Sequence, residues 1–176
     1  GFDHVLRVWR LAERIGRAEG AEMDVLRAAA LLHDVARPDE ARTGVDHAEA
    51  SARRAEALLA DRPADRVARV AQAIREHRFR GALRPTTVEG RVLYDADKLD
   101  AIGAIGVARA YAVAGALAQG LWADVDPAYA ERAPEAGRRD LGDGRHTPVH
   151  EYLFKLVRLR DLMFTETGRR IADHRH

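Results

Sequence analysis

Apolar residues recur three and four positions apart along nearly the whole chain, and this spacing limits what the chain can fold into. Near the start, Phe2, Val5, Leu6, Trp9 and Ala12 follow it and would share one face of an α-helix. Alternation of apolar and polar residues, which is typical of strands, never extends beyond a few positions. The sequence therefore predicts an all-α fold, and its 176 residues suit a single-domain helical bundle spanning 1–176.

Capping and helix-breaking residues divide this pattern into separate helices. Asp24 is a candidate N-cap for the second helix, and Pro38 and Gly44 mark a loop after it. A basic loop is expected over 78–88 and an irregular excursion over about 120–146, which is rich in Gly and Pro. The predicted helices cover 3–19, 25–35, 46–61, 63–77, 89–119 with a break near Gly103 or Gly106, and one or two segments within 148–172.

Composition excludes several classes of function. The 29 Lys and Arg residues nearly balance 28 Asp and Glu residues, which argues against an obligate nucleic-acid binder. The absence of cysteine excludes disulfides, thiolate metal sites and thiol nucleophiles. No apolar run approaches the roughly 18 residues of a membrane span, and Gly1 to His4 show no signal-peptide pattern. A cytoplasmic protein is the expectation.

The pair His33-Asp34 lies near the end of a strongly apolar predicted helix, directly after Ala28 to Leu32. An unpaired buried carboxylate is costly enough to change its protonation state instead. One interpretation is that the two side chains satisfy each other and cap the neighbouring backbone. The other is that they bind a cation.

A second acidic cluster lies in the stretch from Asp95 to Asp100. At the angular step of a helix, Asp97 and Asp100 share one face while Asp95 points elsewhere. Two carboxylates on an inward face repel each other unless a cation or a shared proton lies between them. The alternative is a solvated acidic helix start, which the apolar residues on both sides of the cluster disfavour.

His4 lies one turn before Val8 on an apolar stripe and, taken alone, is typical of a core histidine. Together, His4, His33, Asp34 and Asp97 come from three predicted helices and suit a metal site inside a helical bundle. Imidazole and carboxylate ligands without cysteine favour a divalent Mn, Fe, Co, Zn or Mg ion, with Mn or Fe preferred. Water in an open coordination position would become a nucleophile.

The order His, His-Asp, Asp resembles that of the HD-domain metal-dependent phosphohydrolases. The resemblance spans nearly the whole chain and is carried by residues 3–8 (DHVLRV), 29–35 (AALLHDV), 95–109 (DADKLDAIGAIGVAR), 152–156 (YLFKL) and 165–169 (TETGR). It implies an HD-type helical fold, a divalent metal, and hydrolysis of a phosphate ester or anhydride. It also implies His4, His33, Asp34 and Asp97 as ligands, because Asp97 aligns with the family's final metal-binding Asp.

His47 and His77 leave two interpretations open. Both lie at ends of predicted helices, where histidine is common at the surface. Some HD proteins, however, place two further histidines between the His-Asp pair and the last Asp, and bind two metals. That order is present here.

The resemblance has one departure, because Arg37-Pro38 stands where some family members carry an acidic residue, with Asp39 and Glu40 lying beyond. Asp100, His77 or a metal-bound carboxylate is therefore the candidate for general acid or base. Several cationic or polar residues could bind the phosphate of a substrate. The other interpretation is that these residues only form ion pairs at the surface. The predicted substrate-binding residues are Lys98, His47, Arg37, Arg109 and Lys155, with Arg78 and Arg80 as further basic candidates.

These features predict a metal-dependent phosphohydrolase that acts on a nucleotide or a small phosphorylated metabolite. Nucleic acid and membrane are not expected partners, and a homodimer is left open. One alternative is an HD-fold di-iron oxygenase, which would need His47 and His77 as additional ligands. The other is a binding or sensor module without catalysis.

Overall fold

A computed structural model describes residues 1–78, 84–126 and 146–175. Within these ranges the secondary structure is helical, with no strand. The all-α prediction is therefore confirmed. Part of the predicted basic loop, including Arg80, and most of the predicted excursion lie outside the described residues.

The first helix, α1, runs from Phe2 to Glu19 and ends at Gly20, whose φ of 73° is left-handed. Glycine adopts this conformation without a steric penalty, which is why the helix stops there. Val8, Ala12 and Ile15 are fully buried. Of the face predicted from the spacing, Ala12 is buried, Val5, Leu6 and Trp9 are partly buried, and Phe2 is 70% exposed.

The second helix, α2, runs from Met23 to Leu32, and its N-cap differs from the prediction. The side chain of Glu22 accepts the backbone N–H of Asp24, so Glu22 is the cap and Asp24 lies in the first turn. The strongly apolar sequence of this helix predicts burial on every side, but Leu31 is 43% exposed. The helix ends three residues before the predicted Val35, with His33 as its C-cap.

The predicted loop at Pro38 is a short helix, α3, from Arg37 to Thr43. Proline is compatible with the first turn of a helix because no intrahelical partner is needed for its missing N–H. Gly44, with a φ of 70°, closes the helix. The prediction of a loop was wrong because Pro38 begins a helix here rather than ending one.

Two longer helices follow and confirm the predictions for this region. Helix α4 runs from His47 to Leu58, and Asp46 caps it by accepting the backbone N–H groups of Ala48 and Glu49. Helix α5 runs from Ala64 to Glu76 directly after Pro63. These two helices pack against each other, and α5 also packs against α2.

The long helical run predicted from residue 89 is broken, as expected, into α6 (Val88–Leu99) and α7 (Ala104–Ala116). The break lies at Gly103, where φ is 76° and a Cβ would lie 2.7 Å from the main-chain oxygen of Arg175. Within the described residues, no single helix is long and apolar enough to cross a bilayer. Only α6 and α7 taken together reach that length, across a 67° bend.

The C-terminal region contains three elements where one or two helices were predicted. These are α9 (Pro148–Phe154), a 3₁₀ helix (Leu156–Leu162) and α10 (Glu166–Arg175). The buried carboxylate of Asp95 on α6 accepts the backbone N–H of Phe164 and both the N–H and the hydroxyl of Thr165. These bonds fix the start of α10 against α6.

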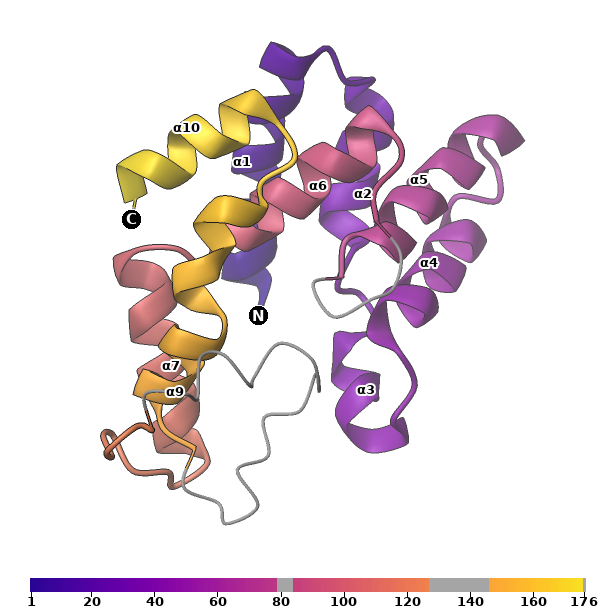
Figure 1. The fold of residues 1–176 in the computed structure, drawn as a ribbon. Helices are drawn as coiled ribbons and strands as arrows, with labels where there is room; N and C mark the ends of the chain where they lie inside the picture. Colours follow the sequence, from indigo (N-terminus) through magenta and orange to yellow (C-terminus); the bar gives the residue numbers. More distant parts are fainter. Residues whose placement is uncertain (79–83, 127–145, 176) are drawn as a thin grey trace.

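Helix α6 packs against α1, α2, α5 and α10. In Figure 1, α4 and α5 lie on one side of the view and α7 and α9 on the other, with α1 and α6 between them. The core at this junction contains fully buried aliphatic side chains, including Ile15, Leu26, Ile74, Leu93 and Leu99. Five helix ends carry the histidines and aspartates singled out in the sequence: the starts of α1 and α4 and the ends of α2, α5 and α6.

Candidate metal centre

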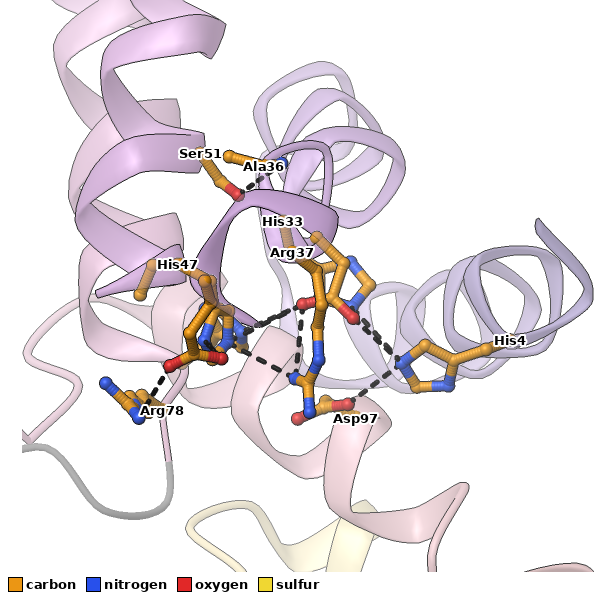
Figure 2. Close-up of polar contacts among 12 residues, drawn as sticks. His4, His33, Ala36, Arg37, His47, Ser51, Arg78 and Asp97 are labelled. Carbon is orange, nitrogen blue, oxygen red and sulfur yellow. Dashed lines mark hydrogen bonds and ion pairs between the residues drawn. The ribbon is translucent and has the colours of Figure 1, made fainter. Parts of the chain in front are cut away.

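The four residues predicted as metal ligands lie together. His4 is in the first turn of α1, His33 and Asp34 follow α2, and Asp97 is in the last turn of α6. His4 Nε2 is 3.3 Å from Asp97 Oδ1, 3.4 Å from His33 Nε2 and 3.7 Å from Asp34 Oδ2. Figure 2 shows His4, His33 and Asp97 approaching one another from these separate elements.

His47 and His77 approach the same carboxylate from its other side. His47 Nε2 is 3.6 Å and His77 Nε2 is 4.0 Å from Asp34 Oδ1, whereas His33 Nε2 is 3.8 Å from Oδ2. Asp34 thus lies between two pairs of imidazoles. Among the described residues, two groups of side chains have ligand atoms close enough to hold a cation, and they share Asp34. One is His4, His33 and Asp34, and the other is Asp34, His47 and His77.

The backbone around Asp34 is itself held in place. Asp34 lies in the short turn between α2 and α3. The buried hydroxyl of Ser51 on α4 accepts the backbone N–H of Ala36 at 3.1 Å in the same turn. Figure 2 shows this bond above the histidine cluster. The turn is therefore tied to α4, the helix that also presents His47.

Main-chain carbonyls orient two of the histidines. His33 Nδ1 lies 2.8 Å from the oxygen of Ala30, and His77 Nδ1 lies 2.5 Å from the oxygen of Ile74. A carbonyl only accepts hydrogen bonds, so Nδ1 must carry the proton in both rings. In the neutral rings, the lone pair is therefore on Nε2, which faces Asp34.

Carboxylates orient the other two histidines. His4 Nδ1 lies 2.7 Å from Asp100 Oδ2, and His47 Nδ1 lies 2.9 Å from Glu40 Oε2. All four rings thus direct Nε2 toward the cluster and have an oxygen within 2.9 Å of Nδ1, although at His47 the geometry is not that of a hydrogen bond. This orientation is the usual one for histidines that bind metals through Nε2.

Lys98 provides a buried positive charge beside the cluster. Its ammonium nitrogen is 2.5 Å from Asp97 Oδ2 and 3.0 Å from the main-chain oxygen of His77. Burial alone would raise the pKa of Asp97, but the positive charge of Lys98 outweighs burial and, with the neighbouring histidines, holds that pKa well below its usual value. Asp97 is therefore an anion at neutral pH.

The pKa values of the buried histidines shift in different directions. Burial lowers the pKa of His33, and it lowers the pKa of His77 to about 3. Burial also acts to lower the pKa of His4, but hydrogen bonds to Asp100 and Asp97 outweigh it and raise that pKa. His33 and His77 are therefore neutral at physiological pH, the state in which imidazole binds a metal.

The cluster has the chemistry of a divalent cation site. Asp34 Oδ1 is buried and accepts no hydrogen bond from the described residues, although buried carboxylate oxygens normally have partners. The nearest groups are imidazole nitrogens with free lone pairs and the guanidinium of Arg37, 3.5 Å away. Imidazole nitrogen and carboxylate oxygen suit Mn, Fe, Co or Zn. The residues present therefore fit a divalent metal.

A cavity of about 1000 Å³ opens in front of the cluster. All five predicted substrate-binding residues line it. Arg37 Nη1 is 3.4 Å from His47 Nε2, and Arg109 Nη1 is 2.8 Å from Asp100 Oδ2. The cavity therefore has positively charged side chains around an acidic and imidazole-rich floor.

Asp100, predicted as a general acid or base, lies behind His4. Its side chain is 2% exposed and is absent from the described lining of the cavity. It accepts hydrogen bonds from Arg7 Nε at 2.6 Å and from Arg109 at 2.8 Å, in addition to His4. These interactions outweigh burial and lower the pKa of Asp100 to about 2.

Two lining residues were not assigned a role from the sequence. Glu40 lies between His47 and Arg78, with Oε1 2.9 Å from Arg78 Nη2. Arg7 lies one turn after His4 on α1 and also lines the cavity. Its spacing from His4 placed it on the same helix face and could have indicated it. The contact of Glu40 with His47 depends on α3, which was predicted to be a loop.

The all-α fold gathers four imidazoles and two carboxylates into a candidate metal site at the junction of its helices. The HD domain family model matches residues 1–102 of the chain. The chain belongs to this family.

Relatives extend the similarity over nearly the full chain. The uncharacterized protein YpgQ of Bacillus subtilis is 37% identical over 180 residues, covering 99% of this chain and 77% of YpgQ. The crystal structure of YpgQ in complex with ADP has a TM-score of 0.69 and 35% identity, covering 98% of this chain and 80% of that one. An HD-superfamily hydrolase from Bacillus thuringiensis has a TM-score of 0.71 and 27% identity, with coverages of 98% and 77%.

Proposed function

We propose that this protein is a metal-dependent phosphohydrolase that uses water to cleave a phosphate ester or anhydride. The observation that carries the proposal is the position of Asp34, whose two oxygens lie 3.6 to 4.0 Å from four imidazole Nε2 atoms. These nitrogens come from separate helical segments and have their lone pairs directed inward. Such a cluster beside a cavity with basic walls suits hydrolysis at a phosphorus centre.

His4, His33, Asp34 and Asp97 would hold the divalent metal, with Mn or Fe preferred for this ligand set. When bound, the metal supplies a water molecule of lowered pKa and a Lewis acid for a phosphate oxygen. His47 and His77, together with Asp34 Oδ1, which accepts no hydrogen bond from the described residues, offer ligands for a second metal.

The basic residues around the cavity would bind the phosphate. Arg37 and Arg109 are about half exposed, so their guanidinium groups can reach a ligand. Lys98 is already engaged with Asp97 and would act through its charge. Lys155 lines the same cavity. Arginine forks and lysine charges both stabilise phosphate oxygens.

His77 is the better candidate of the two residues predicted for proton transfer. Its Nδ1–H is bonded to Ile74, so its Nε2 lone pair faces the cluster and can accept a proton. Asp100 is enclosed by His4, Arg7 and Arg109 and has no described position on the cavity wall. If a second metal is held there, His77 becomes one of its ligands instead.

A nucleotide is the proposed class of substrate, with a small phosphorylated metabolite as the wider class. The cavity volume of about 1000 Å³ is at the upper end of the range for small-molecule sites. YpgQ, which is similar to this chain over nearly its full length, has been crystallised in complex with ADP. The cluster would then contact the phosphates.

The second group of ligands supports one alternative function. Because Asp34, His47 and His77 can complete a second metal site, the same cluster could hold two irons and react with oxygen. This alternative predicts turnover that consumes oxygen and depends on iron. The hydrolase predicts release of phosphate or pyrophosphate without oxygen.

The test is a panel of nucleotides incubated with Mn, Fe, Co, Zn or Mg, with phosphate and pyrophosphate measured as products. We expect hydrolysis by the parent and none by the double variant His33→Ala/Asp34→Ala. Asp173→Ala, which removes an exposed carboxylate paired with Arg160, is the matched control and should retain activity. Equal hydrolysis by the double variant and the parent would overturn the mechanism. A parent that binds nucleotide without turnover would indicate a binding module.

A further inference from the structure

Asp100 combines three properties that separate it from the other carboxylates near the cluster. It is 2% exposed, it contacts His4 at the nitrogen that faces away from Asp34 and Asp97, and two arginines share its oxygens. A buried carboxylate with this many donors stays in one orientation.

We propose that Asp100 is a positioning residue that fixes the tautomer and the ring orientation of His4. The proposal rests on the proposed function in one respect, because His4 would be a metal ligand. It assigns Asp100 no contact with substrate and no part in proton transfer.

The geometry of the His4 ring supports this role. Nδ1 is 2.7 Å from Asp100 Oδ2, while Nε2 is 3.3 Å from Asp97 Oδ1 and 3.7 Å from Asp34 Oδ2. An ionised carboxylate only accepts hydrogen bonds, so the proton must be on Nδ1 for this contact to be favourable. The lone pair of the neutral ring is then on Nε2, which faces the candidate ligands.

His4 depends on a side-chain partner more than His33 and His77 do. Those two rings are bonded to carbonyls of their own preceding helices, three residues back along the chain. His4 is in the first turn of α1 and has no preceding helical turn. Its partner instead comes from the end of α6, 96 positions away.

Arg7 and Arg109 complete the arrangement by fixing Asp100. Arg7 donates to both oxygens, at 2.6 and 3.1 Å, from one turn further along α1. Arg109 donates from α7 at 2.8 Å. Asp100 therefore connects α1, α6 and α7 at the back of the cluster. A neutral amide at this position would keep one acceptor oxygen for these three donors and would turn its NH2 group toward partners that are themselves donors.

The experiment compares Asp100→Asn with Asp95→Asn. Both remove a buried carboxylate from the same region of α6, but Asp95 is bonded to Phe164 and Thr165 and to no histidine among the described residues. The first measurement is the tautomer of His4 in the metal-free protein, from nitrogen-15 shifts at alkaline pH where imidazoles are neutral. The His4 signals are assigned by their loss in His4→Gln.

We expect the Nδ1–H tautomer in the parent and in Asp95→Asn, and a shift toward the Nε2–H tautomer in Asp100→Asn. A parent ring in the Nε2–H form overturns the proposal, whether or not the variant folds. An unchanged tautomer in a folded Asp100→Asn variant also overturns it.

The second measurement is affinity for Mn²⁺ alone, by titration calorimetry. Loss of an outer partner of a ligating histidine commonly weakens metal binding by about 10- to 100-fold. We expect that loss for Asp100→Asn and an affinity close to the parent's for Asp95→Asn. Equal losses in the two variants would overturn the specific role of Asp100. If the parent binds no Mn²⁺, the proposed function fails, and the tautomer measurement still decides the role of Asp100.

Discussion

The ammonium nitrogen of Lys98 lies 2.5 Å from Oδ2 of its neighbour Asp97, and both side chains belong to the last turn of α6. Lys98 is 4% exposed, and it also contacts the carbonyl of His77 and the ring of Tyr94. The pair leaves the other oxygen of Asp97 facing His4. A fixed internal cation therefore keeps one ligand anionic before any metal binds.

Lys98→Met should destabilise the metal-free protein, because it leaves the Asp97 charge with less compensation. Removing one partner of a buried ion pair typically lowers the free energy of unfolding by about 3 kcal/mol or more. Urea unfolding with a chelator present measures the change. The matched control is Arg53→Met, which breaks an exposed pair with Glu49 and should change stability by less than about 1 kcal/mol. Similar losses in both variants would contradict the role of burial.

Metal binding should stabilise the protein against unfolding, and each of the two ligand groups should bind its own ion. A cation at 100 times its dissociation constant raises the free energy of unfolding by about 2.7 kcal/mol. Asp34→Ala should abolish the response to Mn²⁺, because Asp34 belongs to both groups. His47→Ala should remove only the second group. Calorimetric stoichiometry checks this. An unchanged stoichiometry in His47→Ala would show that His47 holds no metal, and a parent that binds one ion would exclude a second metal.

Local periodicity predicted most of the helices but not the details of their ends. The apolar spacing was sufficient for α1, α4 and α5, and the glycines at 103 and 106 indicated the break between α6 and α7. The helix α3 was missed because a proline such as Pro38 can either begin or end a helix, and sequence alone does not distinguish the two cases. Glu22 was missed as a cap because Asp24 has the stronger statistical preference.

The candidate ligands were easier to predict than their partners. Histidine and aspartate in apolar surroundings stand out in the sequence because burial without compensation is costly. The partners of His4 and His47 do not stand out in this way. Asp100 is 96 positions from His4, and Glu40 reaches His47 only because α3 folds as a helix. Contacts of this kind depend on tertiary packing.

Two glycines in the C-terminal half should respond oppositely to alanine. At Gly168 on α10, a Cβ would lie 2.3 Å from Asp95 Oδ2 and 2.7 Å from Thr165 Oγ1. Gly168→Ala should therefore disrupt the bonds between α6 and α10 and lower the free energy of unfolding by about 1 to 3 kcal/mol. At Gly115 on α7, a Cβ would meet no atom of the described residues within 4 Å beyond its own helix backbone, so Gly115→Ala should stabilise by about 0.5 to 1 kcal/mol. Thermal unfolding of both variants checks the signs, and a stabilising Gly168→Ala would contradict the packing.

Glu89 should make the stability of the protein depend on pH in the acidic range. Burial acts to raise its pKa, but the backbone N–H of Glu22 and the guanidinium of Arg69 outweigh burial and lower the pKa below 4.5. A carboxyl group with a lowered pKa in the folded state stabilises the protein above its unfolded pKa, and this stability is lost as the pH falls through the folded pKa. Glu89→Gln should therefore cost about 1 to 3 kcal/mol near neutral pH, and the difference from the parent should shrink at lower pH. Urea unfolding at several pH values measures both curves. A difference that stays constant with pH would show that the ionised form of Glu89 contributes nothing.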